Sequence, residues 1–169
     1  MATRTSLRDY QRELAARLQS AGSGRAASRL GVQVGAGRWL VDLTEAGEVI
    51  PVPPITPVPL TRPWFRGVAN IRGNLYSVVD FACFLGGPPA PIGEQARLLL
   101  LNERFRMASA LLVDRSLGLR SAEDLQPQPA GVPRLPWVRA EFADLQGERW
   151  KELDVPQLVQ HPEFLGVGA

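Results

Sequence analysis

The side chains that could carry out catalysis are few, and their types and spacing argue against an enzyme. His161 and Cys83 are the only histidine and the only cysteine of the chain. One nitrogen ligand and one sulfur ligand cannot make a zinc site of the usual kind. A Ser-His-Asp or Cys-His arrangement would have to recruit His161, which lies beside Pro162 near the C-terminus. Cys83 falls in the apolar run 81–85 and is expected to be a core side chain.

Asp80 and Asp114 are the only carboxylates whose setting suggests general acid–base chemistry. Each follows a strand-like run, residues 77–79 and 111–113. A pair that shares a proton needs its carboxyl groups about 3 Å apart. The alternative, which we favour, is that each aspartate ends a strand and accepts backbone N–H hydrogen bonds. The sequence therefore predicts no catalytic residue.

Cofactor and phosphate-binding motifs are also missing from the sequence. Gly35 and Gly37 lack the third glycine and the following helix of a dinucleotide-binding loop. No Gly-Lys-Ser or Gly-Lys-Thr phosphate loop occurs. We expect no cofactor and no metal, and the remaining possibility is a protein that works by binding.

Length and composition are those of a water-soluble globular protein. The 169 residues, 45% of them hydrophobic, suffice for one ordinary domain or two small, closely packed halves. Apolar runs such as Leu98–Leu101 are far shorter than the ~20 residues that cross a bilayer, and no segment resembles a signal peptide. A lone cysteine fits a reducing compartment. We expect a cytoplasmic protein without direct membrane insertion.

Charge is distributed unevenly along the chain, although the net charge is only +2. Residues 1–40 hold seven arginines and two acidic residues, whereas residues 141–169 hold six acidic residues and two basic ones. A simple explanation is that the two ends lie against one another in the fold. The small net charge gives no reason to expect nucleic-acid binding.

The hydrophobic pattern begins with one helix and then changes to strands. Residues 6–21 carry apolar side chains at helical spacing after a capping-box sequence, and glycines at 22 and 24 end the helix. This helix either docks on its own domain or serves as an arm for a partner. Short strands with turn signals between them follow and favour an all-β sandwich or barrel. The expected strands lie near residues 30–34, 39–43, 48–50, 67–71, 75–81, 97–102, 107–114, 138–145 and 149–153.

Two further segments are expected to differ from this pattern. Residues 51–63 contain six prolines, which exclude a helix and remove hydrogen-bond donors, so this segment should be an irregular loop pinned by its apolar members. The tail over residues 155–165 is expected to add a helical turn.

The most informative segment is residues 65–86, FRGVANIRGNLYSVVDFACFLG. Gly67 and Gly73 bracket a strand and a tight turn. Alternation places Arg72 at the end of the hairpin while Ala69 and Ile71 are buried. A guanidinium fixed beside a glycine turn is suited to bidentate capture of a carboxylate or of backbone carbonyls on another protein.

This segment resembles the CheW-like chemotaxis coupling proteins. The hallmark of that family is a G-V-x-N-[LI]-R-G turn, a strand that ends in V-D-[LF], and a short helix that ends in Leu-Gly. The matching positions are 67–73, 78–81 and 85–86, and weaker matches extend over roughly residues 30–160. Two departures stand out in the second half, because Ala110 and Ser116 replace the usual Gly and Val of the family.

The resemblance implies both a fold and a role. The fold is all-β, with two intertwined five-stranded SH3-like β-barrels and a hydrophobic groove between them. A CheW-like domain would span residues 29–169, after an N-terminal helical extension over residues 1–28. The role is that of an adaptor that joins the cytoplasmic tip of a chemoreceptor to the regulatory domain of a histidine kinase, with assembly into arrays. The helix and the proline-rich loop favour the pilus-associated, PilI-like branch, which acts in type IV pilus twitching motility.

The resemblance also implies the partner-binding residues. The arginine of the turn lies at the receptor and kinase contact region in the family, and this role carries over to Arg72. Asn70 and Gly73 belong to the same turn. Glu48 and Val49 belong to the family's E-V-I segment, in the same functional neighbourhood.

Alternatives remain open at this point. One is a coupling protein of the flagellar type. Another is a nucleic-acid-binding β-barrel, suggested by eighteen arginines and by tryptophans at 39, 64, 137 and 150, and a third is an enzyme of unknown type.

Overall fold

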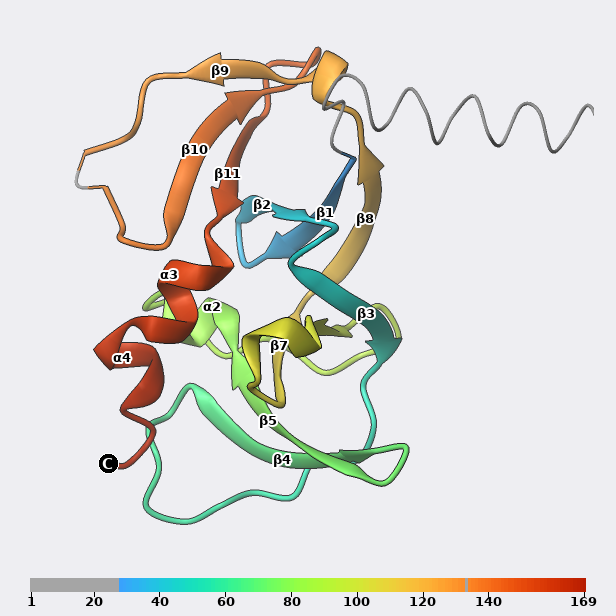
Figure 1. Cartoon of the computed structure of the whole chain (residues 1–169), viewed down its shortest axis with the longest axis vertical. Coiled ribbons are helices and arrows are strands. Elements are labelled where there is room, and N and C mark those ends of the chain that lie inside the picture. Colours follow the sequence, from blue (N-terminus) through green and yellow to red (C-terminus); the bar gives the residue numbers. More distant parts are fainter. Residues whose placement is uncertain (1–27, 133) are drawn as a thin grey trace, which may run out of the picture.

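The computed structural model describes residues 28–132 and 134–169, which form two β-sheets (Figure 1). The first sheet has the strand order β8-β1-β2-β11-β10-β9, and the second has the order β3-β6-β7-β5-β4. The first sheet contains β1 Arg29–Val34, β2 Gly37–Asp42, β8 Arg115–Arg120, β9 Gln126–Gln128, β10 Val138–Ala143 and β11 Arg149–Leu153. The second sheet contains β3 Ala46–Pro51, β4 Phe65–Ile71, β5 Asn74–Asp80, β6 Arg97–Leu101 and β7 Ser109–Val113.

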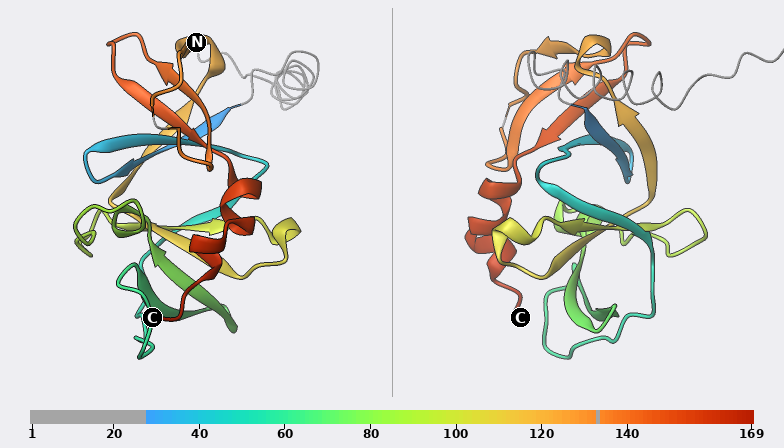
Figure 2. Two further views of the ribbon diagram at one scale, coloured as in Figure 1. Left: turned by 90° about the vertical axis from the view of Figure 1, so that its left-hand side faces the viewer. Right: turned by 45° about the vertical axis from the view of Figure 1, so that its right-hand side comes forward.

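The two sheets are intertwined, as the resemblance implies. The chain builds β1 and β2 in the first sheet, crosses to the second sheet for β3 to β7, and then returns to the first sheet. Short helices occupy the connections and the C-terminal end: α2 Phe81–Phe84, η1 Glu103–Phe105, η2 Ala122–Asp124, α3 Val155–Gln160 and α4 Pro162–Leu165. Figure 2 shows the C-terminal helices running along one side from the first sheet toward the second.

The strands expected from the sequence are present, including the antiparallel pairs β1–β2, β4–β5, β6–β7 and β10–β11. The sequence did not predict β8 and β9. Strand β8 follows β7 after a single residue and is an edge strand whose side chains are mostly exposed. It therefore lacks the alternation of apolar and polar residues that reveals a half-buried strand.

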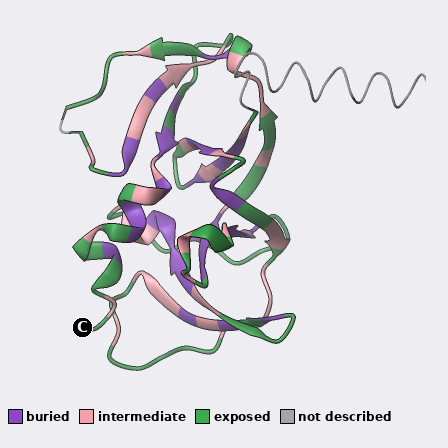
Figure 3. Cartoon of the chain, in the orientation of Figure 1, coloured by how far each residue is buried: buried purple, intermediate pink, exposed green. Residues whose placement is uncertain are grey.

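The middle strands of the second sheet are buried on both faces. In β6, Leu98 and Leu100 belong to a cluster inside the second sheet, whereas Leu99 and Leu101 belong to a central cluster shared with the first sheet. Successive side chains of a strand point to opposite faces, so a run of consecutive leucines serves two cores at once. The first sheet has its own smaller cluster around Trp150. Figure 3 shows the buried residues concentrated along these inner strands.

Each sheet surrounds its own apolar cluster, which agrees with the expected SH3-like barrels, but the first sheet has six strands where five were expected. Within the described residues, no continuous ladder joins the two edge strands of the second sheet, β3 and β4. The edges are linked instead by an isolated bridge, in which Thr56 and Val68 exchange N–H···O bonds of 2.8 and 2.9 Å. The apolar residues between the two sheets form the central cluster and are buried there.

The proline-rich loop over residues 51–63 is irregular, as expected, but its apolar members pin it only in part, because Val52 and Ile55 pack on the cluster inside the second sheet while Val58 and Leu60 are exposed. The bridge between Thr56 and Val68 holds its middle, and a second bridge joins Thr61 to Gly168 in the C-terminal tail. The tail itself forms α3 and α4, which confirms the helical character expected there.

The uneven charge distribution is explained in part by contacts between the two ends of the described chain. Arg29 donates to Glu152 at 2.8 Å, and Arg38 lies 3.6 Å from Glu148. The expected helix over residues 6–21, and nearly all of the extension over residues 1–28, lie outside the described residues. In the described part of the chain, no helix is long and apolar enough to span a membrane.

Gly67 is required at the bridge that links the sheet edges. Its φ is +132°, and a Cβ at this position would overlap the carbonyl oxygen of Thr56. We predict that Gly67→Ala lowers the free energy of unfolding by roughly 2–4 kcal/mol, because the new methyl group must push the loop away and the backbone conformation disfavours alanine.

Chemical denaturation followed by circular dichroism measures this change. Gly93→Ala is the matched control, because a Cβ there meets no atom within 4 Å. Equal stability of the two variants would contradict the role assigned to Gly67.

Candidate functional site

The β4–β5 turn holds Arg72 in an unusual backbone conformation. Arg72 and Gly73 both have positive φ values, +52° and +85°, as in the primed turns that join twisted antiparallel strands. The side-chain oxygen of Asn70 accepts a 2.9 Å hydrogen bond from the Gly73 N–H and fixes the turn. A left-handed backbone conformation is unfavourable for arginine, so the hairpin geometry imposes it at a cost in conformational free energy.

A β-bulge in strand β3 places Glu48. The register between β3 and β6 shifts between Ala46 and Val49, so Gly47 and Glu48 form the bulge. A Cβ on Gly47 would lie only 3.1 Å from the carbonyl oxygen of Leu100, so the glycine allows the backbone to pass close to β6. Bulges turn a strand locally and re-aim a side chain, and here the exposed side chain is Glu48.

Arg72 and Glu48 form a bidentate ion pair across the two edges of the second sheet. Arg72 Nη1 donates to Glu48 Oε2 at 2.8 Å, and Nη2 donates to Oε1 at 2.5 Å. The two side chains remain 68% and 45% exposed, so partners can reach them. The resemblance placed both residues in one neighbourhood, but no sequence pattern predicted that they contact each other.

The pair shifts the pKa values of both groups. The hydrogen bonds from Arg72 lower the pKa of the Glu48 carboxyl, and the same contact raises the pKa of the Arg72 guanidinium. Both groups are therefore fully charged at neutral pH, and the pair presents a fixed positive group beside a fixed negative one.

A surface depression of about 320 Å³ adjoins this ion pair. Its walls come from the β3 bulge, from the β4–β5 hairpin and from the connection between β6 and β7. The lining residues are Gly47, Glu48, Ile71, Arg72, Asn74, Tyr76, Leu100, Leu101, Asn102 and Glu103. The depression carries charged and amide side chains together with a few apolar ones, and so it offers recognition rather than a reactive group.

The structure gives the five sequence-predicted site residues different positions. Arg72 and Glu48 expose their charged groups, and Asn70 is exposed while its oxygen fixes the turn. Gly73 supplies backbone freedom at the turn. Val49 is half-buried against the central cluster and is not freely available. A partner-binding role for these residues stays a prediction.

The two aspartates behave as capping residues, as favoured from the sequence. Asp80 is completely buried and accepts N–H bonds from Cys83 at 3.1 Å and Ala90 at 2.8 Å, with Arg66 as a nearby cation. Asp114 accepts the N–H of Gly35 at 2.8 Å. Each carboxylate serves a different set of backbone groups and stabilises a different turn.

The contacts of His161 and Cys83 are also structural ones. His161 Nδ1 accepts the Glu163 N–H at the start of α4, and its ring lies edge-on to Trp137 at 5.1 Å. Cys83 is half-buried rather than the core side chain expected, because its side of the short helix α2 is turned partly outward. Burial, followed by the charge of Asp80, raises the pKa of its thiol. Among the described residues, no cluster of three or more His, Cys, Asp or Glu side chains is arranged to hold a metal.

The tryptophans that suggested nucleic-acid binding do not form an exposed platform. Trp39, Trp137 and Trp150 are buried, with at most 5% of their surface exposed. Trp64 is half-buried against Phe84 and Phe164. Base stacking requires exposed aromatic faces, so this arrangement argues against the nucleic-acid alternative.

Comparisons with known proteins agree with the geometry. The family profile described as a CheW-like domain matches residues 29–163. Protein PilI of Pseudomonas aeruginosa is 30% identical over 146 residues, which cover 83% of this chain and 79% of that protein. The crystal structure of the scaffolding protein TtCheW from Thermoanaerobacter tengcongensis matches with a TM-score of 0.64 at 16% identity, over 75% of this chain and 88% of the other. At that identity the structural match shows a shared fold.

The pKa of Glu48 reports on the ion pair directly. We predict that carboxyl-carbon NMR gives a titration midpoint for Glu48 below its ordinary value of 4.5, and that Arg72→Ala raises this midpoint. Because the pKa of Glu48 is lowered in the folded chain, the ion pair stabilises the fold above pH 4.5. This stabilisation is lost as the pH falls through the lowered pKa. A midpoint that is unchanged by Arg72→Ala would show that the two side chains do not pair in solution.

Proposed function

The chain belongs to the CheW-like domain family, and from that premise we propose that it is a chemosensory adaptor without catalytic activity. It couples the cytoplasmic tip of a chemoreceptor to the regulatory domain of a CheA-type histidine kinase. The observation that carries this proposal is the exposed, bidentate Arg72–Glu48 pair, held on two sheet edges at the position that the family resemblance assigns to partner contact.

The site is built for recognition by a rigid surface. The turn at Arg72 is fixed by Asn70, and the bulge at Glu48 is fixed by its pairing with β6. Charged groups held in place lose little freedom when a partner binds, which favours specificity over catalysis. A contact of modest area gives complexes that exchange readily. Assembly in an array then raises the effective affinity through multivalency.

For the pathway, we propose control of type IV pili and twitching motility. The resemblance to the PilI-like branch implies this role, and 30% identity with Protein PilI supports it over the flagellar alternative. The protein then works in the cytoplasm and is recruited to membrane-bound receptor arrays by its partners.

Binding to the two partners tests the proposal. We predict that Arg72→Ala weakens binding of a receptor-tip fragment or of the kinase regulatory domain by roughly tenfold or more, because the partner loses its contact with a guanidinium that is held in place. Isothermal titration measures the affinity, and circular dichroism checks that the fold is intact. Arg149→Ala is the matched control, since Arg149 is an exposed arginine on β11 in the first sheet.

A charge-swapped double variant separates partner contact from local positioning. Glu48→Arg combined with Arg72→Glu can restore an ion pair within the chain but reverses the charges that the partner meets. The double variant should therefore bind as weakly as Arg72→Ala. Full recovery of binding by the double variant would mean that the pair only positions the turn. A wild-type chain that binds neither partner would refute the adaptor function.

A further inference from the structure

In the part of the chain that the structure describes, one charge beside the ion pair has no counter-ion. Three charged side chains line the 320 Å³ depression: Arg72, Glu48 and Glu103. Arg72 and Glu48 neutralise each other through two hydrogen bonds. Among the described residues, Glu103 has no ion-pair partner, and its side chain is exposed. The depression therefore carries one uncompensated negative charge.

Among the described residues, neither Arg104 nor Arg106, the two arginines nearest in sequence, forms an ion pair with Glu103. Arg104 stacks on the ring of Phe105 at 4.9 Å, and its guanidinium lies 3.9 Å from the buried carboxylate of Glu45. It is not among the residues that line the depression. The positive charge of Arg104 is thus directed toward another carboxylate.

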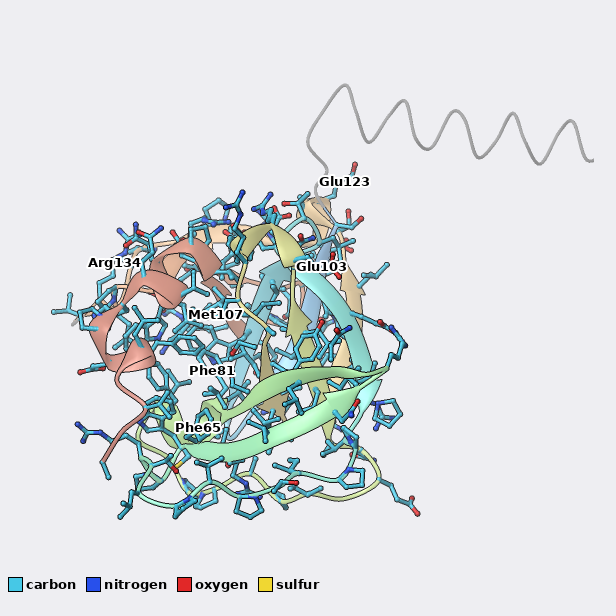
Figure 4. All side chains as sticks on the ribbon, turned by 60° about the horizontal axis from the view of Figure 1, so that its bottom comes forward. Phe65, Phe81, Glu103, Met107, Glu123 and Arg134 are labelled. Carbon is cyan, nitrogen blue, oxygen red and sulfur yellow. The ribbon has the colours of Figure 1, made fainter. Side chains whose placement is uncertain are left out.

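Glu103 stands on a fixed loop. The side chain of Asn102 accepts the Arg104 N–H at 3.0 Å, and the Asn102 N–H donates to the carbonyl oxygen of Glu45 at 3.0 Å. Phe105 and Met107 anchor the same loop on the central cluster. Figure 4 shows Glu103 on this loop beside strand β3. The backbone that carries Glu103 is thus fixed, so a partner can bind its carboxylate without reorganising the loop.

The rest of the lining suits a long side chain with a positive end. Tyr76 is half-buried and offers an aromatic surface, whereas Ile71, Leu100 and Leu101 are core residues with at most 7% of their surface exposed. Lysine and arginine bury their methylene stems on such surfaces while the charged end reaches a carboxylate. An acidic side chain would meet Glu103 and Glu48, and an apolar one would leave the Glu103 carboxylate desolvated without a partner.

We propose that this depression receives one lysine or arginine side chain of the protein that contacts Arg72, and that Glu103 is its counter-ion. The inference rests on the proposed function and specifies the chemistry of the partner. Because Arg72 and Glu103 border the same depression, one partner contacts both. The complete surface is then specific for a partner that places a basic side chain beside the Arg72–Glu48 ion pair.

Charge reversal at Glu103 tests this inference in the full chain. The affinities of the receptor-tip fragment and of the kinase regulatory domain are measured for the wild type, Arg72→Ala, Glu103→Lys and Glu103→Gln. We expect Glu103→Lys to lower the affinity by roughly tenfold or more, for the same partner whose affinity Arg72→Ala lowers. Glu103→Gln should cause a smaller loss of affinity. Added salt should reduce the affinity of the wild type more than that of Glu103→Gln.

Glu123→Lys is the matched control. Glu123 is also an exposed glutamate in a short 3₁₀ helix, and Figure 4 shows it on η2, a different element from the loop of Glu103. This control should bind both partners like the wild type, and thermal unfolding should show that every variant is folded.

Each other outcome overturns the inference. Unchanged or tighter binding by Glu103→Lys, or an equal loss with Glu123→Lys, would exclude a specific basic side chain at this depression. If Glu103→Lys weakened binding only of the partner that does not depend on Arg72, Arg72 and Glu103 would not belong to one binding surface. The adaptor function would survive these results as long as Arg72→Ala still weakens binding, and it fails only if the wild-type chain binds neither protein.

Discussion

The structure depends on burying both faces of strands β6 and β7. Leu99 and Leu111 face the central cluster, while Leu98 and Leu112 face the cluster inside the second sheet. These strands lie inside the sheet, and β3 and β4 form its two edges. The position of the functional site follows from this arrangement, because the site is built where the second sheet ends.

The edges β3 and β4 are joined in two different ways. A pair of backbone hydrogen bonds between Thr56 and Val68 joins the loop after β3 to β4, and it needs a glycine at position 67. The Arg72–Glu48 ion pair spans the same two edges through side chains. Unpaired sheet edges invite association, and side chains that meet across them define which partners can approach. The backbone link thus serves the fold, and the side-chain link presents the surface.

The sequence predicted local features better than long-range ones. The hairpin at Arg72 was predictable because glycines and alternating apolar residues are local signals, and the Leu98–Leu101 run marked a buried strand. Strand β8 was missed because its burial is slight and its partner β1 lies about half the chain away in sequence. The contact between Glu48 and Arg72 depends on a bulge whose register shift involves a third strand, β6, and no local pattern encodes such a shift. Cys83 was misplaced because an apolar run does not tell which side of a short helix faces outward.

The conformation of Arg72 is the strongest physical argument for the proposed binding role of this surface. A left-handed backbone costs conformational free energy for any residue with a side chain, and glycine or asparagine would avoid that cost at this turn. An ion pair as exposed as Arg72 and Glu48 returns little stability to the folded chain, since water and salt screen it. The fold therefore gains little from an arginine at this position. A partner gains a cation whose position, orientation and charge are all set before contact, and preorganisation of this kind strengthens binding because less freedom is lost on association.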